Sequence, residues 1–139
     1  MKLLTTVSAI LSVLLASCAR PASDESYSLL GPDGCAGFSL DMTDSLDYSL
    51  RLYVYADAAP SDSLPVRIDY LSPDEKVYRE DIILTNADAA SGSARQMVLC
   101  RDLRLGFRPA CYGVWKASVY IKDNENITGA GLRLYREKR

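Results

Sequence analysis

The sequence predicts an all-β fold, a single antiparallel β-sandwich or jelly roll. Apolar and polar residues alternate along short segments, as expected for strands with one buried face. Turn residues separate these segments at intervals of about ten residues, which is typical of sandwiches and barrels. Helical periodicity is almost absent. Residues 31–139 are enough for one domain with a core of its own.

The first residues have the pattern of a lipoprotein signal peptide. Lys2 precedes the apolar run Leu3–Leu15, and the segment Leu15-Ala16-Ser17-Cys18 resembles a bacterial lipobox. The competing interpretation is a membrane-spanning helix, but the run is shorter than the roughly 20 apolar residues that such a helix needs. We therefore expect residues 1–17 to be removed and Cys18 to be lipidated, with ordinary signal-peptide cleavage as the alternative.

The lipid anchor predicts a location in the cell envelope. Ala19 stands where retention at the inner membrane usually requires Asp, so we expect an outer-membrane lipoprotein that faces the periplasm or the cell surface. Several acyl chains hold a protein at a membrane far more firmly than a single chain does. We expect residues 18–30 to be the lipidated cysteine followed by a flexible tether.

Alternation predicts four strands in the first half of the domain. Residues 38–42 alternate after a turn at Gly31–Gly34, and residues 66–70 and 77–84 flank a turn at 72–75, as in a hairpin. The strand at 48–55 has its apolar residues on one face, namely Tyr48, Leu50, Leu52 and Val54. Its other face holds Ser49, Arg51, Tyr53 and Tyr55.

The second half adds three strands and two connections. Residues 86–94 are small and polar and predict a mobile loop, and residues 96–105 predict the next strand. The strongest pattern is at 113–122, with Trp115, Ala117, Val119 and Ile121 on the inner face and Tyr120 on the outer face. A polar turn at 123–126 leads to a last strand that begins at Ile127.

The composition argues against catalysis. The chain has no histidine, which removes the commonest general base and the usual catalytic triads. Paired carboxylates could cleave glycosides, but the acidic residues fall at turns and solvent-facing positions. The turn at 123–126 has oxygen ligands without the spacing of a calcium loop. We expect no enzyme, no metal and no cofactor, and a net charge of −2 gives no reason to expect a nucleic acid.

Three cysteines follow Cys18, and an exported protein meets an oxidising compartment. Cys100 and Cys111 flank a short connection, so they are the pair that we expect a disulfide to join. Cys35 with Cys111 is the alternative. Neither pattern resembles a zinc site.

Tyrosine is in excess, with nine in the chain. Tyr53, Tyr55 and Tyr120 fall on strand faces opposite the expected core, where aromatic rings can stack on sugars or contact a protein partner. Ser45 and Ser63 each stand between Asp and Leu, a pattern that matches the acceptor of a bacterial O-glycosylation system. Both would lie in loops, where a glycan can be accommodated.

Several segments resemble the gliding-motility lipoprotein H (GldH-like) family of small bacterial lipoproteins. These are Tyr48–Val54, Leu64–Pro73, Gly113–Lys116 and Asn126–Leu134, the last with the Gly-Leu-Arg ending of that family. The resemblance implies a non-enzymatic accessory or scaffold for gliding, or for the associated secretion or envelope machinery, with protein partners in the envelope. The alternative hypothesis is a glycan-binding β-sandwich module on the cell surface.

Overall fold

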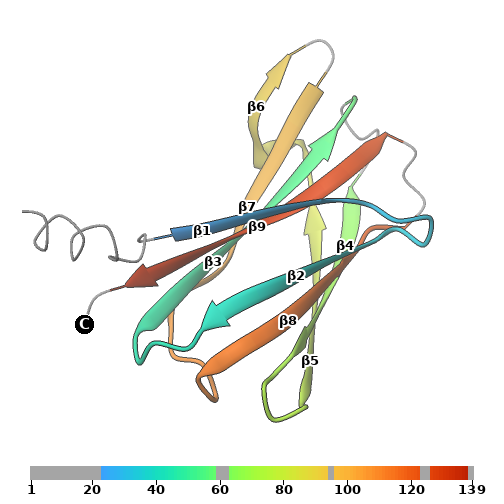
Figure 1. Cartoon of the computed structure of the whole chain (residues 1–139). Helices are drawn as coiled ribbons and strands as arrows, with labels where there is room; N and C mark the ends of the chain where they lie inside the picture. Colours follow the sequence, from blue (N-terminus) through green and yellow to red (C-terminus); the bar gives the residue numbers. More distant parts are fainter. Residues whose placement is uncertain (1–22, 59–62, 94–95, 123–125, 138–139) are drawn as a thin grey trace, which may run out of the picture.

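The computed structural model describes residues 23–58, 63–93, 96–122 and 126–137, and within these ranges the regular structure is almost entirely β (Figure 1). The signal peptide and Cys18 lie outside the described residues. The strands are β1 (Ser23–Leu29), β2 (Cys35–Met42), β3 (Asp47–Ala56), β4 (Leu64–Leu71), β5 (Val77–Leu84), β6 (Ala89–Ser93), β7 (Gln96–Phe107), β8 (Gly113–Tyr120) and β9 (Ile127–Glu137).

Two antiparallel sheets make up the sandwich. Sheet A has the order β1-β9-β3-β7-β6, and sheet B has the order β2-β8-β4-β5. The pairs β1–β9, β2–β8, β3–β7 and β4–β5 are nested inside one another along the chain. Such nesting is what results when one long antiparallel hairpin is rolled into two layers. The order is that of a jelly roll, and the predicted fold class is confirmed.

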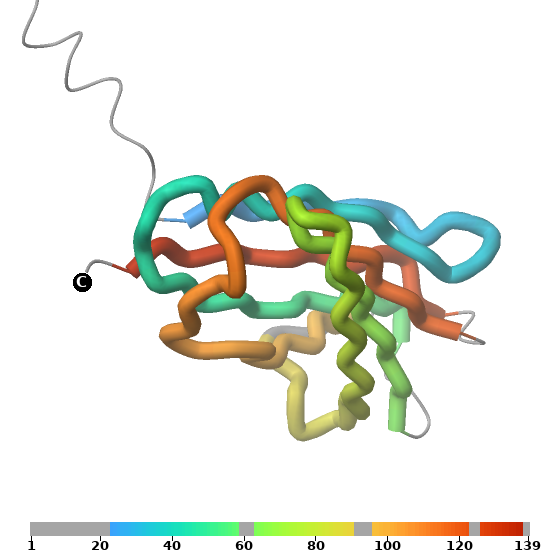
Figure 2. The backbone as a smooth tube through the Cα atoms, turned by 90° about the horizontal axis from the view of Figure 1, so that it is seen from below, coloured from blue at the N-terminus to red at the C-terminus, as the bar shows by residue number. Residues whose placement is uncertain are grey.

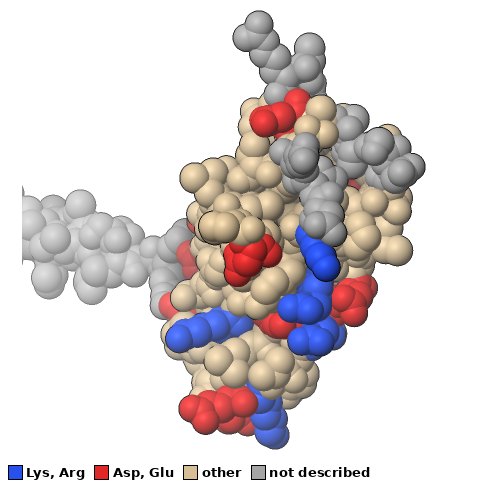
Figure 3. Space-filling model, turned by 90° about the vertical axis from the view of Figure 1, so that its right-hand side faces the viewer, with Lys and Arg blue, Asp and Glu red and all other residues tan. Residues whose placement is uncertain are grey.

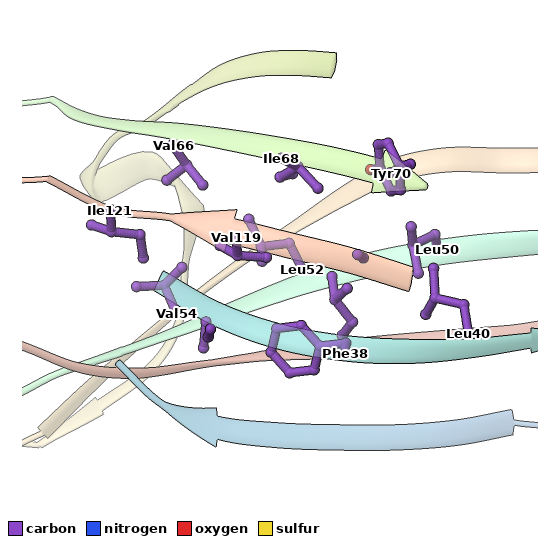
Figure 4. Close-up of a cluster of buried hydrophobic side chains, with 14 of the residues drawn as sticks. Phe38, Leu40, Leu50, Leu52, Val54, Val66, Ile68, Tyr70, Val119 and Ile121 are labelled. Carbon is purple, nitrogen blue, oxygen red and sulfur yellow. The ribbon is translucent and has the colours of Figure 1, made fainter. Parts of the chain in front are cut away.

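The core lies between the sheets, where the inner faces of β3 and β9 in sheet A meet those of β2, β4 and β8 in sheet B (Figure 4). The inward residues are those that alternation predicted: Tyr48, Leu50, Leu52, Val54, Val66, Ile68, Tyr70, Trp115, Ala117, Val119 and Ile121. The hydroxyl of buried Tyr48 donates a hydrogen bond to the Asp44 carbonyl at 2.8 Å, so its polar atom has a partner.

The turn between β1 and β2 projects from one end of the sandwich (Figure 2). The Gly34 amide donates to the Gly31 carbonyl at 2.9 Å, as in a β-turn. Gly34 has a φ of 74°, and a Cβ there would lie 2.4 Å from the Ile121 carbonyl oxygen. Glycine is therefore needed where this turn contacts the end of β8.

The predicted tether is wrong from residue 23 onward. Residues 23–29 form β1, which pairs with β9 over its whole length, from Ser23 opposite Tyr135 to Leu29 opposite Gly129. An edge strand needs only a free neighbouring edge, because its backbone hydrogen bonds do not depend on apolar alternation. The polar sequence of β1 gave no such alternation, and the domain begins earlier than residue 31.

The predicted mobile loop at 86–94 is also wrong for its described residues. Residues 86–88 form the 3₁₀ turn η1, and β6 follows and pairs with β7. Thr85 and Asp88 form a capping box. The Thr85 side chain accepts a hydrogen bond from a backbone amide of the turn, and the Asp88 side chain accepts one from the Thr85 backbone amide. Asp88 also binds Arg101 of β7 at 2.7 Å, which ties this connection to sheet A.

Candidate functional site

The outer face of sheet A holds four tyrosines and two arginines. Strand register brings them into adjacent rows: Tyr27 of β1 and Tyr53 of β3 both lie opposite Gly131 of β9. Tyr55 lies one row away from this shared row. Tyr135 lies two rows away from it on the opposite side. We call this surface the aromatic face, defined by Tyr27, Tyr53, Tyr55, Tyr135, Arg51 and Arg133.

Two glycines of β9 let the tyrosine rings approach the strand closely on the aromatic face. Gly129 and Gly131 present no side chain to it, and β9 lies between the tyrosines of β1 and β3. A Cβ on Gly129 would lie 2.5 Å from the Tyr27 hydroxyl oxygen, so the Tyr27 ring lies over that glycine. Tyr27 and Tyr55 make an edge-to-face pair with ring centroids 5.0 Å apart. Tyr27 remains 53% exposed, so much of its ring is open to a ligand.

The arginines gather around Tyr53 and Tyr135. The guanidinium carbons of Arg51 and Arg133 lie 5.7 and 5.4 Å from the centre of the Tyr135 ring, a cation–π arrangement. A hydrogen bond with Asp102 at 2.6 Å, and then one with Tyr53, raises the pKa of Arg51. A hydrogen bond with Tyr53 is also the main reason why the pKa of Arg133 is raised. Both groups are therefore cations at any physiological pH.

Sequence reasoning found half of this tyrosine cluster. Tyr53 and Tyr55 face outward as expected. Tyr27 was missed because residues 18–30 were assigned to the tether, and Tyr135 was not singled out in the last strand. The signal that could have found Tyr135 is its alternation with Leu132 and Leu134, which are buried.

Tyr120 does not belong to the aromatic face, so the predicted trio is wrong as a single surface. Tyr120 lies on β8, on the outer face of sheet B, and the Arg67 guanidinium covers its ring at 4.2 Å. Asp69 pairs there with Arg67 at 3.7 Å and with Arg79 at 2.9 Å. On the side of the molecule shown in Figure 3, basic and acidic side chains likewise lie next to one another.

A separate cleft of about 190 Å³ lies between the sheets, beside β5 and β7. Tyr78 and Trp115 form one wall, with ring centroids 5.7 Å apart. The Tyr70 hydroxyl donates to Glu80 at 3.1 Å, and burial followed by the Glu80 charge raises the pKa of Tyr70. Trp115 is only 7% exposed and its indole nitrogen donates to the Cys111 carbonyl, so Tyr78 is the accessible ring.

The predicted disulfide is not formed. Cys35, Cys100 and Cys111 are all free thiols. Cys100 lies opposite Tyr53 on the outer face of sheet A, whereas Cys111 lies in the connection to β8, with its sulfur 3.5 Å from an Asp74 oxygen. Burial raises the pKa of the Cys100 thiol, so it stays protonated and weakly nucleophilic at neutral pH. The two cysteines of the predicted pair therefore have different neighbours, Tyr53 and Asp74.

The two expected glycosylation positions are accessible. Ser45 is exposed in the bend before β3, and Ser63 is exposed just before β4. Their modification stays a prediction, which the intact mass of the exported protein would check.

The described residues hold no cluster of three or more His, Cys, Asp or Glu side chains suited to a metal ion. The acidic turn considered for calcium lies largely in residues 123–125, outside the described ranges. Within those ranges there is also no helix of the length and hydrophobicity that crossing a bilayer requires.

No protein-family model matches the sequence, and no curated protein matches it either. Among solved structures, the chain is similar to a family GH115 4-O-methyl-α-glucuronidase, with 11% identity and a TM-score of 0.47. That match covers 88% of this chain but only 18% of the glucuronidase.

Two carbohydrate-binding modules are also similar in structure. For a CBM4 module the identity is 11% and the TM-score is 0.43, over 81% of this chain and 71% of the module. For TmCBM61, in complex with β-1,4-galactotriose, the values are 9% and 0.40, over 84% and 83%. Likeness at this level concerns the sandwich fold only, and function must be argued from the residues of this chain.

Proposed function

We propose that this protein is a non-catalytic carbohydrate-binding module and that the aromatic face is its binding surface. The observation behind the proposal is the gathering of four tyrosines and two arginines on one outer sheet face, over a strand that contributes glycine. Outward tyrosines add nothing to the core, and a concentration of aromatic rings on one exposed face is typical of an interaction surface.

The chemistry of the face suits a sugar chain. Pyranose rings have apolar C–H faces that stack on tyrosine, and the phenol hydroxyls and guanidinium N–H groups can bond the sugar hydroxyls. A pair of aromatic rings contributes about 0.5–1.5 kcal/mol beyond the burial of area, and we take the same order of magnitude for a sugar stacked on tyrosine. Several modest contacts in a row favour a polymer over a monosaccharide, because each added residue of the polymer meets another ring.

Glycan-array screening of the full-length protein in detergent tests this proposal. Tyr53→Ala and Tyr27→Ala should each weaken binding, by about two- to tenfold. Tyr120→Ala is the matched control, because it removes an arginine-stacked tyrosine from the opposite sheet, and it should bind as the wild type does. No binding on a broad array, or equal losses in all three variants, would count against the proposal.

The location is a separate proposal: lipidation of Cys18 holds the module at the outer membrane. Support comes from the lipobox pattern and from the entry of the chain at the edge strand β1. Cys18→Ser should move the protein from the membrane fraction to the soluble fraction without changing its thermal unfolding. If the variant stays with membranes, this proposal fails.

A protein-binding accessory role, as the GldH-like resemblance implies, is the second candidate. The favouring observation is β5, an edge strand of sheet B on which Val77 is 65% and Ile83 is 54% exposed. An open strand edge with apolar side chains can pair with an extended segment of a partner. Co-purification from crosslinked envelopes should then recover motility, secretion or envelope-assembly proteins. Recovery of glycan-utilisation proteins alone would favour the first candidate.

A further inference from the structure

Two arginines stand directly opposite each other in the aromatic face. Arg51 of β3 and Arg133 of β9 are cross-strand partners, and the same row continues to Glu25 on β1 and Asp102 on β7. Like charges in directly opposite positions destabilise a sheet. Such a pair therefore needs compensation, either from neighbouring carboxylates or from a bound anion.

Among the described residues, only one of these two arginines forms an ion pair with a carboxylate. Asp102 binds Arg51 at 2.6 Å. Glu25 contributes to the electrostatic environment of Arg133, but no ion pair joins Arg133 to a carboxylate of the described residues, and its buried Nε has no hydrogen-bond partner there. The guanidinium of Arg133 thus faces Glu25 without forming an ion pair, so it keeps donors that a ligand carboxylate can bind.

The neighbouring groups hold both guanidiniums in place. Arg51 and Arg133 each lie against the Tyr135 ring, and Asp102 also holds Arg51 through a hydrogen bond of 2.6 Å. Rotamer freedom that is already lost in the free protein is not lost again on binding, so such a site is preorganised. Guanidinium forks match a carboxylate, because two parallel N–H···O bonds can form in one plane.

We infer that the glycan bound by the aromatic face is acidic, with a uronic acid carboxylate on Arg133 and Arg51 and the sugar rings on the tyrosines. This inference rests on the proposed function, since it specifies the ligand of the same surface. A hexuronic acid carries its carboxylate beside the ring, so a stacked sugar can present the charge to an arginine next to the stacking tyrosine.

The test compares acidic polymers with their neutral counterparts. Affinity electrophoresis would use full-length protein in detergent with polygalacturonate, alginate and hyaluronan, each also in carboxyl-reduced form. Wild-type protein should prefer at least one acidic polymer, with an affinity that falls as salt is added. Arg133→Gln should weaken that binding by about 10- to 100-fold, the range for a lost hydrogen bond to a charged group. Binding of the carboxyl-reduced polymer should fall much less, because Arg133 then loses only hydrogen bonds to neutral hydroxyls.

Two further variants separate charge from structure. Arg133→Lys keeps the charge without the planar fork and should recover only part of the affinity, whereas Glu25→Gln removes a competing anion and should strengthen binding. Thermal unfolding of Arg133→Gln should match or exceed the wild type, because the like-charge pair is gone.

The outcomes distinguish the two proposals. Equal affinity for acidic and reduced polymers, with loss in Tyr53→Ala, overturns the inference and leaves the proposed function standing. An acidic preference that survives Arg133→Gln also overturns it. If neither form of any polymer binds and the glycan array is negative as well, both proposals fail.

Discussion

Gly129 decides how Tyr27 is presented on the aromatic face. The strand has no side chain at this position, and the ring of Tyr27 occupies the space that a Cβ would fill. The edge-to-face contact with Tyr55 then fixes the orientation of the two rings relative to each other. The lack of a side chain at this one position of β9 therefore determines where the Tyr27 ring lies on the proposed binding surface.

Gly129→Ala should weaken carbohydrate binding by about two- to tenfold, as the loss of one aromatic contact does. The new Cβ would lie 2.5 Å from the Tyr27 hydroxyl oxygen, so the ring must move and its pair with Tyr55 is disrupted. Thermal stability should change little, because the displaced group is the outer end of an exposed side chain.

Gly37→Ala is the control, since nothing lies within 4 Å of a Cβ there. Affinity electrophoresis of the two variants side by side makes the comparison. Wild-type affinity in Gly129→Ala would show that the position of Tyr27 is irrelevant to binding.

At the scale of the elements, Asp88 joins η1 to sheet A. It completes the capping box with Thr85 and binds Arg101 of β7 through both of its oxygens. Burial acts to raise the pKa of Asp88, but the Thr85 amide and Arg101 outweigh it, and the pKa is lowered. The carboxylate is therefore the form that stabilises the fold.

Asp88→Asn should lower the free energy of unfolding by about 1 kcal/mol at neutral pH, because Asn keeps an oxygen for the Thr85 amide but loses the ion pair with Arg101. A group with a depressed folded-state pKa contributes fully above its unfolded pKa, which is about 3.9 for Asp. That contribution disappears as the pH falls through the lower, folded-state pKa. Urea unfolding at pH 7 and at pH 3 should show the difference between variant and wild type shrinking in acid. A constant difference would mean that the charge of Asp88 does not matter.

Alternation predicted some elements and missed others for a physical reason. Strands β3, β4 and β8 bury one whole face, so their period-two pattern is visible in the sequence. Edge strands β1 and β6 are held mainly by backbone pairing, which leaves little trace in side-chain type. The residue pattern of a strand shows which of its faces is buried but does not show which sheet the strand joins. Tyr120 was therefore grouped with Tyr53, although the two lie on the outer faces of different sheets.

The molecule as a whole has two chemically different outer faces. Sheet A presents the tyrosine and arginine cluster, and sheet B presents ion pairs such as Arg79–Asp69 around Tyr120. The nested strand order places the start of β1 beside the end of β9, so the chain enters the sandwich at the edge of sheet A (Figure 1). A lipid anchor at Cys18 would then tether the protein next to the sheet that holds the proposed binding surface.

Backbone amide chemical-shift mapping with the best-binding glycan tests the central claim most directly. The account predicts that shifts concentrate in β1, β3 and β9, around Tyr27, Tyr53 and Tyr135, while the indole signal of Trp115, the only tryptophan, stays in place. Shifts centred instead on Tyr78 and Trp115 in the cleft, or on Tyr120 of sheet B, would contradict it.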